Sequence, residues 1–139
     1  MKNTDRELNI LLDTNFLIVP FQFKIDLKSR FDELIDRKYS LILLNEVYEE
    51  LVKIYNKARG KRKQEIKAAI TYFKNKEKIT ILEKQDNESI DDLLIRIAKK
   101  FNYVVATNDK ILKRRLKNLG INFIYVRQKS FFRANRFLG

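Results

Sequence analysis

Two acidic residues in this sequence stand where buried strands are predicted to end. Asp13 directly follows the apolar run 8–12, and Asp109 follows the run 103–106 after two polar residues. Short apolar runs of this kind predict parallel strands that are buried on both faces. Ligands of α/β proteins bind at the carboxyl ends of such strands, so both carboxylates could serve a binding site. Each could equally be a helix N-cap, a position that Asp favours.

Two further acids are directed toward the same place by helical periodicity. Glu50 flanks the apolar stripe of a predicted helix over 46–59, where a lone charge is costly unless something neutralises it. Asp91 shares the inner face of a helix over 89–100. Its neighbour Asp92 lies over Arg96 and could complete a capping box at the helix start. We favour Asp91 as the ligand, with Asp92 as the open alternative.

The chain contains no Cys and no His, which excludes the usual zinc sites, thiol nucleophiles and imidazole bases. A metal must then be held by oxygen, which favours Mg²⁺ or Mn²⁺. Four converging carboxylates repel one another unless a cation or protons intervene. A bound divalent ion would relieve that repulsion and could activate water for attack on a phosphodiester. Uncharged neighbours that could fix the carboxylates or hold metal-bound waters are Thr14, Asn15, Thr107 and Asn108.

Five predicted strands alternate with helices along the chain. The strands are expected at 8–12, 39–44, 79–82, 103–106 and 121–126, and the main helices at 27–37, 46–59, 61–74, 89–100 and 110–119. A short helix from Phe16 should stop at Pro20. The alternation predicts one α/β domain over residues 1–126, with a mostly parallel five-stranded sheet covered on both faces. Residues 127–139 form a basic, aromatic tail that we expect to pack on this domain or on a partner.

The charge balance points to a polyanionic partner. The 139 residues include 30 Lys and Arg against 18 Asp and Glu, which gives a net charge of +12. Balanced ion-pair networks cannot explain such an excess, and nucleic acid is the simplest partner. No apolar run approaches the roughly 20 residues that span a bilayer, and the charged N-terminus lacks a signal-peptide core. We therefore expect a cytoplasmic protein without a membrane partner.

Three basic segments could follow a phosphate backbone: the turn around Gly60, the helix after Asp109, and the tail. Aromatic residues interleave with the cations of the tail, a combination that suits single-stranded RNA. The alternative is a solvated helical face for the first segment and core packing for the tail aromatics. The expected RNA-binding residues are Lys57, Arg59, Lys61, Arg62, Lys63, Lys110, Lys113, Arg114, Arg115, Arg127 and Lys129.

The ordered set of motifs resembles the PIN-domain nuclease family over about residues 8–127. The matching positions are Asp13-Thr14-Asn15 after the first strand, Glu50-Leu51 on the helix after the second, Asp91 at a later helix start, and Thr107-Asn108-Asp109 after the fourth strand. Within the family, the Asp-Thr-Asn-Phe-Leu and Ala-Thr-Asn-Asp stretches are similar to archaeal relatives of the small-subunit rRNA-processing PIN proteins. The doubled Asp91-Asp92 and the absence of a zinc ribbon are departures.

The resemblance implies a three-layer αβα sandwich with the activity of a Mg²⁺- or Mn²⁺-dependent endoribonuclease, acting on RNA such as an rRNA precursor. It implies that Asp13, Glu50, Asp91 and Asp109 are the catalytic and metal-binding residues, and dimers are common in the family, so a homodimer could form through the tail. Two alternatives remain. The chain could be a catalytically weak RNA-binding factor in ribosome assembly, or the toxin of a toxin–antitoxin pair.

Overall fold

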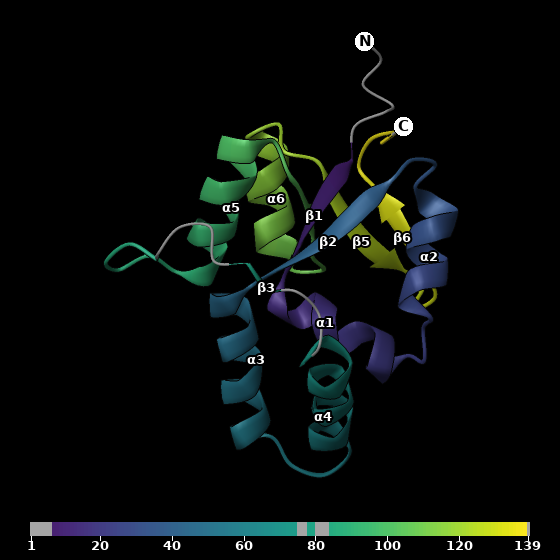
Figure 1. Ribbon diagram of the computed structural model, residues 1–139, viewed down its shortest axis with the longest axis vertical. Helices are drawn as coiled ribbons and strands as arrows, with labels where there is room; N and C mark the ends of the chain where they lie inside the picture. Colours follow the sequence, from purple (N-terminus) through teal and green to yellow (C-terminus); the bar gives the residue numbers. More distant parts are fainter. Residues whose placement is uncertain (1–6, 75–77, 80–83, 139) are drawn as a thin grey trace.

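The computed structural model describes residues 7–74, 78–79 and 84–138, and within them the chain forms one mixed sheet (Figure 1). Its strands are β1 (Leu8–Leu12), β2 (Tyr39–Leu44), β3 (Lys78–Ile79), β4 (Val104–Ala106), β5 (Phe123–Arg127) and β6 (Phe131–Ala134). The strand order is β3-β2-β1-β4-β5-β6, in which the first five strands are parallel and β6 is antiparallel to β5. All five predicted strands are present, although the predicted end of β3 lies outside the described residues. The tail contributes the sixth strand.

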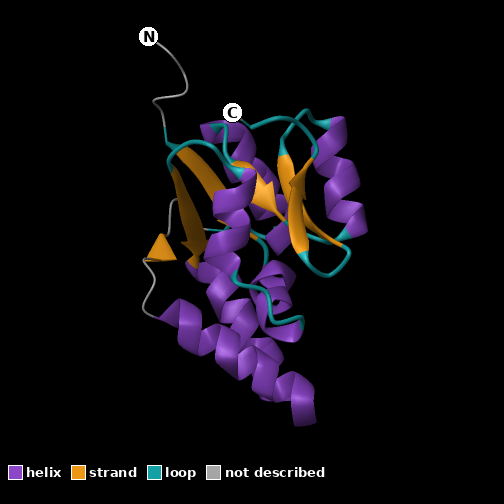
Figure 2. Cartoon of the chain, turned by 90° about the vertical axis from the view of Figure 1, so that its right-hand side faces the viewer, coloured by secondary structure: helices purple, strands orange, loops and turns teal. Residues whose placement is uncertain are grey.

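Helices cover both sides of this sheet (Figures 1 and 2). They are α1 (Thr14–Gln22), α2 (Leu27–Leu34), α3 (Asn45–Lys57), α4 (Gly60–Lys74), α5 (Ile90–Phe101) and α6 (Lys110–Asn118). In Figure 1, α5 and α6 lie on one side and α2 on the other, while α3 and α4 run antiparallel and project beyond the sheet. None of these helices is long and apolar enough to cross a membrane. The predicted α/β fold with a three-layer arrangement is confirmed.

The prediction that Pro20 stops the first helix is wrong, because α1 continues to Gln22. Proline has no N–H to donate to the carbonyl one turn earlier, at Phe16, but later donors still bond normally. The N–H of Phe23 reaches the carbonyl oxygen of Val19 at 3.0 Å. Residues 16–20 are all buried, so packing of the helix outweighs the lost hydrogen bond.

Smaller differences concern helix ends. The second helix ends at Leu34 and not at residue 37, because Ile35 has an extended backbone and packs into the core. Helix α3 begins at Asn45, one residue before the predicted start, and its N-cap position falls on Leu44, which makes no side-chain hydrogen bond. Ser89 does cap α5, as its hydroxyl accepts the N–H of Asp92 at 3.1 Å.

Strand β6 fastens the tail to the body through one aromatic side chain. Phe132 is 4 % exposed. Its ring centre lies 5.1 Å from that of Phe16 in α1 and 4.7 Å from that of Phe31 in α2. Phe137, by contrast, is 91 % exposed. The tail therefore supplies part of the core that holds α1 and α2 against the sheet, whereas its last phenylalanine remains at the surface.

We expect Phe132→Ala to lower the free energy of unfolding by about 3–5 kcal/mol, because it leaves a cavity among three packed rings. Urea unfolding followed by circular dichroism measures this change. Phe137→Ala is the matched control and should stay within about 0.5 kcal/mol of the wild type. Equal small effects in both variants would mean that the tail does not contribute to the core.

Candidate active site

The register of two neighbouring strands builds the centre of the site. Leu12 of β1 pairs with Ala106 of β4, and the N–H of Asp13 donates to the carbonyl of Ala106 at 3.0 Å. The next residues along both strands, Asp13 and Thr107, are therefore neighbours at the carboxyl edge of the sheet. From β1 the chain proceeds outward through β2 and β3, and from β4 through β5, so this is the point where strand order reverses. Ligands of open α/β sheets bind at such a point.

Both carboxylate oxygens of Asp13 are held by hydrogen bonds. Oδ1 accepts the N–H of Thr14 at 2.8 Å, and Oδ2 accepts the hydroxyl of Thr107 at 2.7 Å. The Thr107 oxygen in turn accepts the N–H of Asp109 at 3.1 Å. Asp13 is only 5 % exposed and Thr107 is fully buried. This chain of bonds fixes Asp13 in one orientation and connects it to Asp109.

Asp109 is also the N-cap of α6. Its Oδ1 accepts the N–H of Leu112 at 2.8 Å, and no hydrogen bond from the described residues reaches its Oδ2. Asp13 likewise occupies the N-cap position of α1. The sequence left open whether these acids are caps or ligands, and the structure shows that the two roles are compatible. One oxygen of Asp109 completes the helix start while the other remains available to a cation.

Glu50 joins the cluster from helix α3. The buried hydroxyl of Thr14 donates to Glu50 Oε1 at 2.6 Å. Thr14 and Thr107 therefore each hold a carboxylate, as the sequence led us to expect of the polar neighbours. Asn108 instead accepts the N–H of Val126 at 2.7 Å and joins β4 to β5. Asn15 is exposed on the first turn of α1.

Helix α5 separates the roles of its two adjacent acids. Burial raises the pKa of Asp91, and the negative charges of Asp109, Glu50 and Asp92 raise it further, while Arg115 opposes them. Asp92 points to Arg115, whose Nη2 lies 2.6 Å from Asp92 Oδ1, and this bond lowers the pKa of Asp92. The expected partner of Asp92, Arg96, pairs instead with Glu88 at 2.8 Å. The sequence could not identify Arg115 as the partner, because the contact depends on how α5 and α6 pack.

The four acids act on one another electrostatically. Burial raises the pKa of Asp13 to about 6, and the nearby charges of Asp91 and Asp109 add to the shift against the hydrogen bonds from Thr107 and Thr14. Four separate elements, the ends of β1 and β4 and the helices α3 and α5, thus bring Asp13, Asp109, Glu50 and Asp91 into one negative region. Their roles in catalysis and metal binding remain predictions.

The donor set fits a hard divalent cation. Every candidate ligand is a carboxylate oxygen, the kind of ligand that Mg²⁺ and Mn²⁺ prefer. No three acidic side chains among the described residues are already close enough to enclose an ion. Burial is the main cause of the raised pKa of Asp13, and the charges of Asp91 and Asp109 add to it, so these carboxylates repel one another. A cation at this edge would remove that repulsion.

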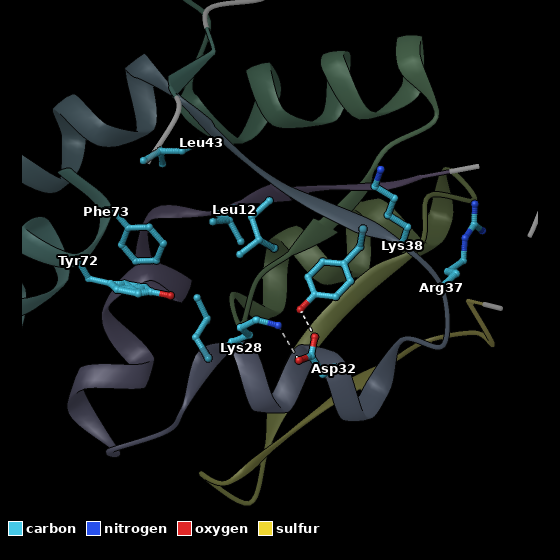
Figure 3. Close-up of a pocket in the computed structure, with 11 residues that line it drawn as sticks. Leu12, Lys28, Asp32, Arg37, Lys38, Leu43, Tyr72 and Phe73 are labelled. Carbon is cyan, nitrogen blue, oxygen red and sulfur yellow. Dashed lines mark hydrogen bonds and ion pairs between the residues drawn. The ribbon is translucent and has the colours of Figure 1, made fainter. Parts of the chain in front are cut away.

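A separate hollow of about 550 Å³ is lined by none of the four acids (Figure 3). It is lined by β2, α2 and α4, with Tyr39, Tyr72 and Phe73 among its walls. The one acid in it, Asp32, already accepts the Tyr39 hydroxyl at 2.6 Å and pairs with Lys28 at 2.9 Å (Figure 3). With its negative charge compensated, this hollow offers no second acidic centre.

The predicted RNA-binding residues lie in three places. Five of them lie around the α3–α4 turn. Lys57, Arg59 and Lys63 line a hollow of about 660 Å³ there, and Lys61 and Arg62 lie beside it in the sequence without lining it. Lys110, Lys113, Arg114 and Arg115 belong to α6, and Arg127 and Lys129 lie where β5 turns into β6, at the same edge of the sheet as the acids. Arg115 differs from the other predicted RNA-binding residues, because its guanidinium already pairs with a carboxylate, that of Asp92.

Residues 10–129 match the family model described as "PIN like domain". The chain is 32 % identical to "Ribonuclease VapC4" of Methanocaldococcus jannaschii over 88 % of its own length and 93 % of that protein. It is 29 % identical to "Ribonuclease VapC9" of Archaeoglobus fulgidus, over 85 % and 82 % of the two chains.

Two solved structures resemble the fold. "Structure of the PIN domain endonuclease Utp24" aligns with a TM-score of 0.74 and 28 % identity over 92 % of this chain and 91 % of the other. A domain of a functionally unknown protein from Methanocaldococcus jannaschii aligns with a TM-score of 0.57 and 20 % identity, over 86 % and 91 % of the two chains. The second similarity concerns the fold alone.

Asp13 should make stability depend on pH when divalent ions are chelated. Its pKa is about 6 in the folded protein and near 4 in the unfolded chain, so the folded state binds the proton more tightly. Its stabilising contribution is present below about pH 4 and is lost as the pH rises through 6, by roughly 3 kcal/mol in all. Urea unfolding in EDTA between pH 4 and 7 measures this loss.

The Asp13→Asn variant should lack this part of the pH dependence and be more stable than the wild type at pH 7 by roughly 1–3 kcal/mol. Asp86→Asn, which neutralises an exposed acid, is the matched control and should follow the wild-type profile. If Asp13→Asn follows the wild-type profile as well, Asp13 is not held in a costly charged state.

Proposed function

This chain belongs to the PIN-like domain family, as its motifs predicted, and we propose that it is a metal-dependent endoribonuclease. The observation that carries the proposal is the convergence of Asp13, Glu50, Asp91 and Asp109, whose charges act on one another at the carboxyl edge of the sheet. The similarity to two proteins named ribonucleases and to a PIN endonuclease structure supports RNA hydrolysis as the reaction.

The four carboxylates would hold Mg²⁺ or Mn²⁺. When bound, the ion would lower the pKa of water and stabilise the charge that develops on the phosphate. The chain itself supplies rigid ligands. Thr107 and Thr14 fix Asp13 and Glu50, and the start of α6 fixes Asp109. Such preorganisation spares the protein from reorienting its charges during the reaction.

The chain has no His, so a carboxylate is the simplest side chain to accept the proton of the attacking water once the ion has lowered its pKa. Asp13 is poorly suited, since hydrogen bonds hold both of its oxygens. Asp91 is better placed, because no hydrogen bond among the described residues holds its oxygens and Arg115 binds the adjacent Asp92. The Asp91 carboxylate would accept the proton with the oxygen that does not bind the ion.

The basic surfaces would bring RNA to this negative site. Glu50 and Lys57 are seven residues apart on α3, so the basic α3–α4 turn begins about 10 Å from Glu50 along the helix. Lys110 follows Asp109 directly, and Arg127 and Lys129 lie at the same edge of the sheet. RNA bound along these cations would cross the acidic cluster, which by itself would repel a phosphate backbone.

Two biological roles, with different RNA substrates, are compatible with this activity. The motif resemblance to rRNA-processing PIN proteins favours processing of an rRNA precursor, and the similarity to a PIN endonuclease structure is compatible with cutting. An RNA-binding role in ribosome assembly without cutting is the alternative. Similarity to the ribonucleases VapC4 and VapC9, over 93 % and 82 % of their lengths, supports the second candidate, the toxin of a toxin–antitoxin pair. Co-purification with a small acidic protein that blocks cleavage would select the toxin, and specific cutting of precursor rRNA would select the first role.

Asp13→Asn and Asp109→Asn should each reduce cleavage of RNA in Mn²⁺ by roughly 10²–10³-fold, because each removes a charged group at the reacting centre. RNA binding in EDTA should persist. A gel assay with single-stranded and structured RNA follows the products. Undiminished cleavage by the Asp13→Asn, Asp109→Asn double variant would refute the proposed site.

The adjacent pair on α5 gives a matched comparison. We expect Asp91→Asn to lose cleavage to a similar extent, whereas Asp92→Asn should stay within about tenfold of the wild type, because Asp92 serves Arg115. The same RNA and metal are used for both variants. The reverse order of effects would make Asp92 the third ligand.

Metal binding should be visible without activity. Mn²⁺ at about 100 times its dissociation constant should add roughly 2.7 kcal/mol to the free energy of unfolding, because a ligand that binds only the folded state stabilises that state. Thermal unfolding with Mn²⁺ or with EDTA measures the difference. The Asp13→Asn, Asp91→Asn double variant should show no such difference, and Asp86→Asn should retain it. Equal shifts in all three proteins would place the ion elsewhere.

A further inference from the structure

A basic hollow of about 560 Å³ lies between α6 and the β5–β6 hairpin, outside the acidic cluster. Its cations are Lys113, Arg114, Lys117 and Arg136, and no acidic residue lines it. We propose that this hollow is a subsite for single-stranded RNA that binds phosphates and one base a few nucleotides away from the cleaved bond. The inference rests on the proposed function for its substrate, and it joins Lys113 and Arg114, already expected to bind RNA, with Lys117, Arg136 and Tyr125 in one site.

Two hydrogen bonds between Asn135 and Phe123 hold the hollow in place. Asn135 Oδ1 accepts the N–H of Phe123 at 2.8 Å, and the N–H of Asn135 donates to the carbonyl of Phe123 at 3.1 Å. These two bonds fix the end of β6 to the start of β5. They bring Arg136 to the hollow, opposite the basic face of α6.

The cations of the hollow lack the carboxylate partners that other basic residues have. Arg115, on the same helix, pairs with Asp92, and Lys28 and Arg30 pair with acids of α2. Among the described residues, no salt bridge is formed by Lys113, Arg114, Lys117 or Arg136. Four positive charges around one hollow repel one another, and a polyanion relieves that repulsion by displacing only loosely held counterions.

An aromatic ring lies beside these charges. Lys113 Nζ is 4.8 Å from the ring centre of Tyr125, which is partly exposed on β5. Because Lys113 lies over this face of the ring, a base could stack there only once the lysine turns to a phosphate, and that phosphate would keep its nucleotide beside Tyr125. Bases of single-stranded RNA stack on such rings, whereas an acidic peptide would use only the charges. This ring favours RNA over an acidic protein as the occupant.

Helix α6 connects the hollow to the acids. Asp109 caps its start, and Lys113 and Lys117 follow at roughly 6 and 12 Å along the helix axis. At about 3.4 Å per phosphate of a stacked strand, 12 Å corresponds to roughly two to four nucleotides. An RNA that lies across the acidic cluster could thus continue along α6 into the hollow.

The test compares two double variants that remove the same number of charges. Lys117→Ala with Arg136→Ala changes the hollow, whereas Lys28→Ala with Lys38→Ala changes the separate hollow of Figure 3. Fluorescence anisotropy measures binding of a 12-nucleotide and a 3-nucleotide single-stranded RNA in EDTA, where no cleavage occurs. We expect the first pair to weaken binding of the long RNA at least tenfold, and to lower its salt slope by about 1.4. The 3-nucleotide RNA, which the hollow can hold by itself, should also bind more weakly to the first pair and be unaffected by the second.

Equal effects of the two double variants, or none from the first, would overturn the proposal. Tyr125→Leu tests the base contact, with Tyr125→Phe as its control. The leucine variant should bind the long RNA about fivefold more weakly or worse, since a stacked base contributes roughly 1–3 kcal/mol, and the phenylalanine variant should bind normally. Polyglutamate that competes as well as RNA of equal charge, with Tyr125→Leu silent, would assign the hollow to an acidic protein instead.

The two proposals fail separately. If the wild-type protein cuts no RNA, but the Lys117→Ala, Arg136→Ala variant binds the long RNA more weakly, the subsite proposal stands and the nuclease proposal fails. If the wild-type protein cuts RNA, but the same double variant binds the long RNA as tightly as the wild type, the nuclease proposal stands and the subsite proposal fails.

Discussion

The hydrogen bond between Thr107 and Asp13 is the contact on which the acidic site depends. It forms because β1 and β4 are adjacent and parallel, so that the residues just beyond Leu12 and Ala106 meet. Without it, Asp13 would be a buried carboxylate with only one bonded oxygen, beside other negative charges. The strand register thus determines which acid is buried, and the hydroxyl makes that burial tolerable.

The acids differ in how directly the sequence predicts them. Asp13 and Asp109 follow apolar strands, and strand ends are visible in a sequence. Glu50 and Asp91 required helical periodicity, which gives the face of a helix but not its neighbour. The pairing of Asp92 with Arg115 could not be predicted for that reason, because it depends on the packing of α5 against α6. Local patterns specify an element, whereas contacts between elements need their arrangement.

Pro20 and β6 fail to follow the local patterns for a related reason. Propensity predicts a stop at Pro20, yet the buried residues around it keep α1 helical. The segment 131–134 is short and carries a charge, so it gives little strand signal by itself. It becomes a strand because β5 would otherwise be an open edge and because Phe132 fits between Phe16 and Phe31. In both places tertiary packing outweighs local preference.

The placement of charge has a direct consequence for how RNA could approach. The acidic cluster repels phosphates, and the protein as a whole carries a net charge of +12. Arg115 is bound to Asp92 and so supports the acidic site, whereas Lys113 and Lys117, about one and two turns after Asp109 on the same helix, face a hollow without acids. Helix α6 therefore presents opposite electrostatic functions on its two sides. It steadies the acidic cluster on one side and offers a polyanion a path away from that cluster on the other.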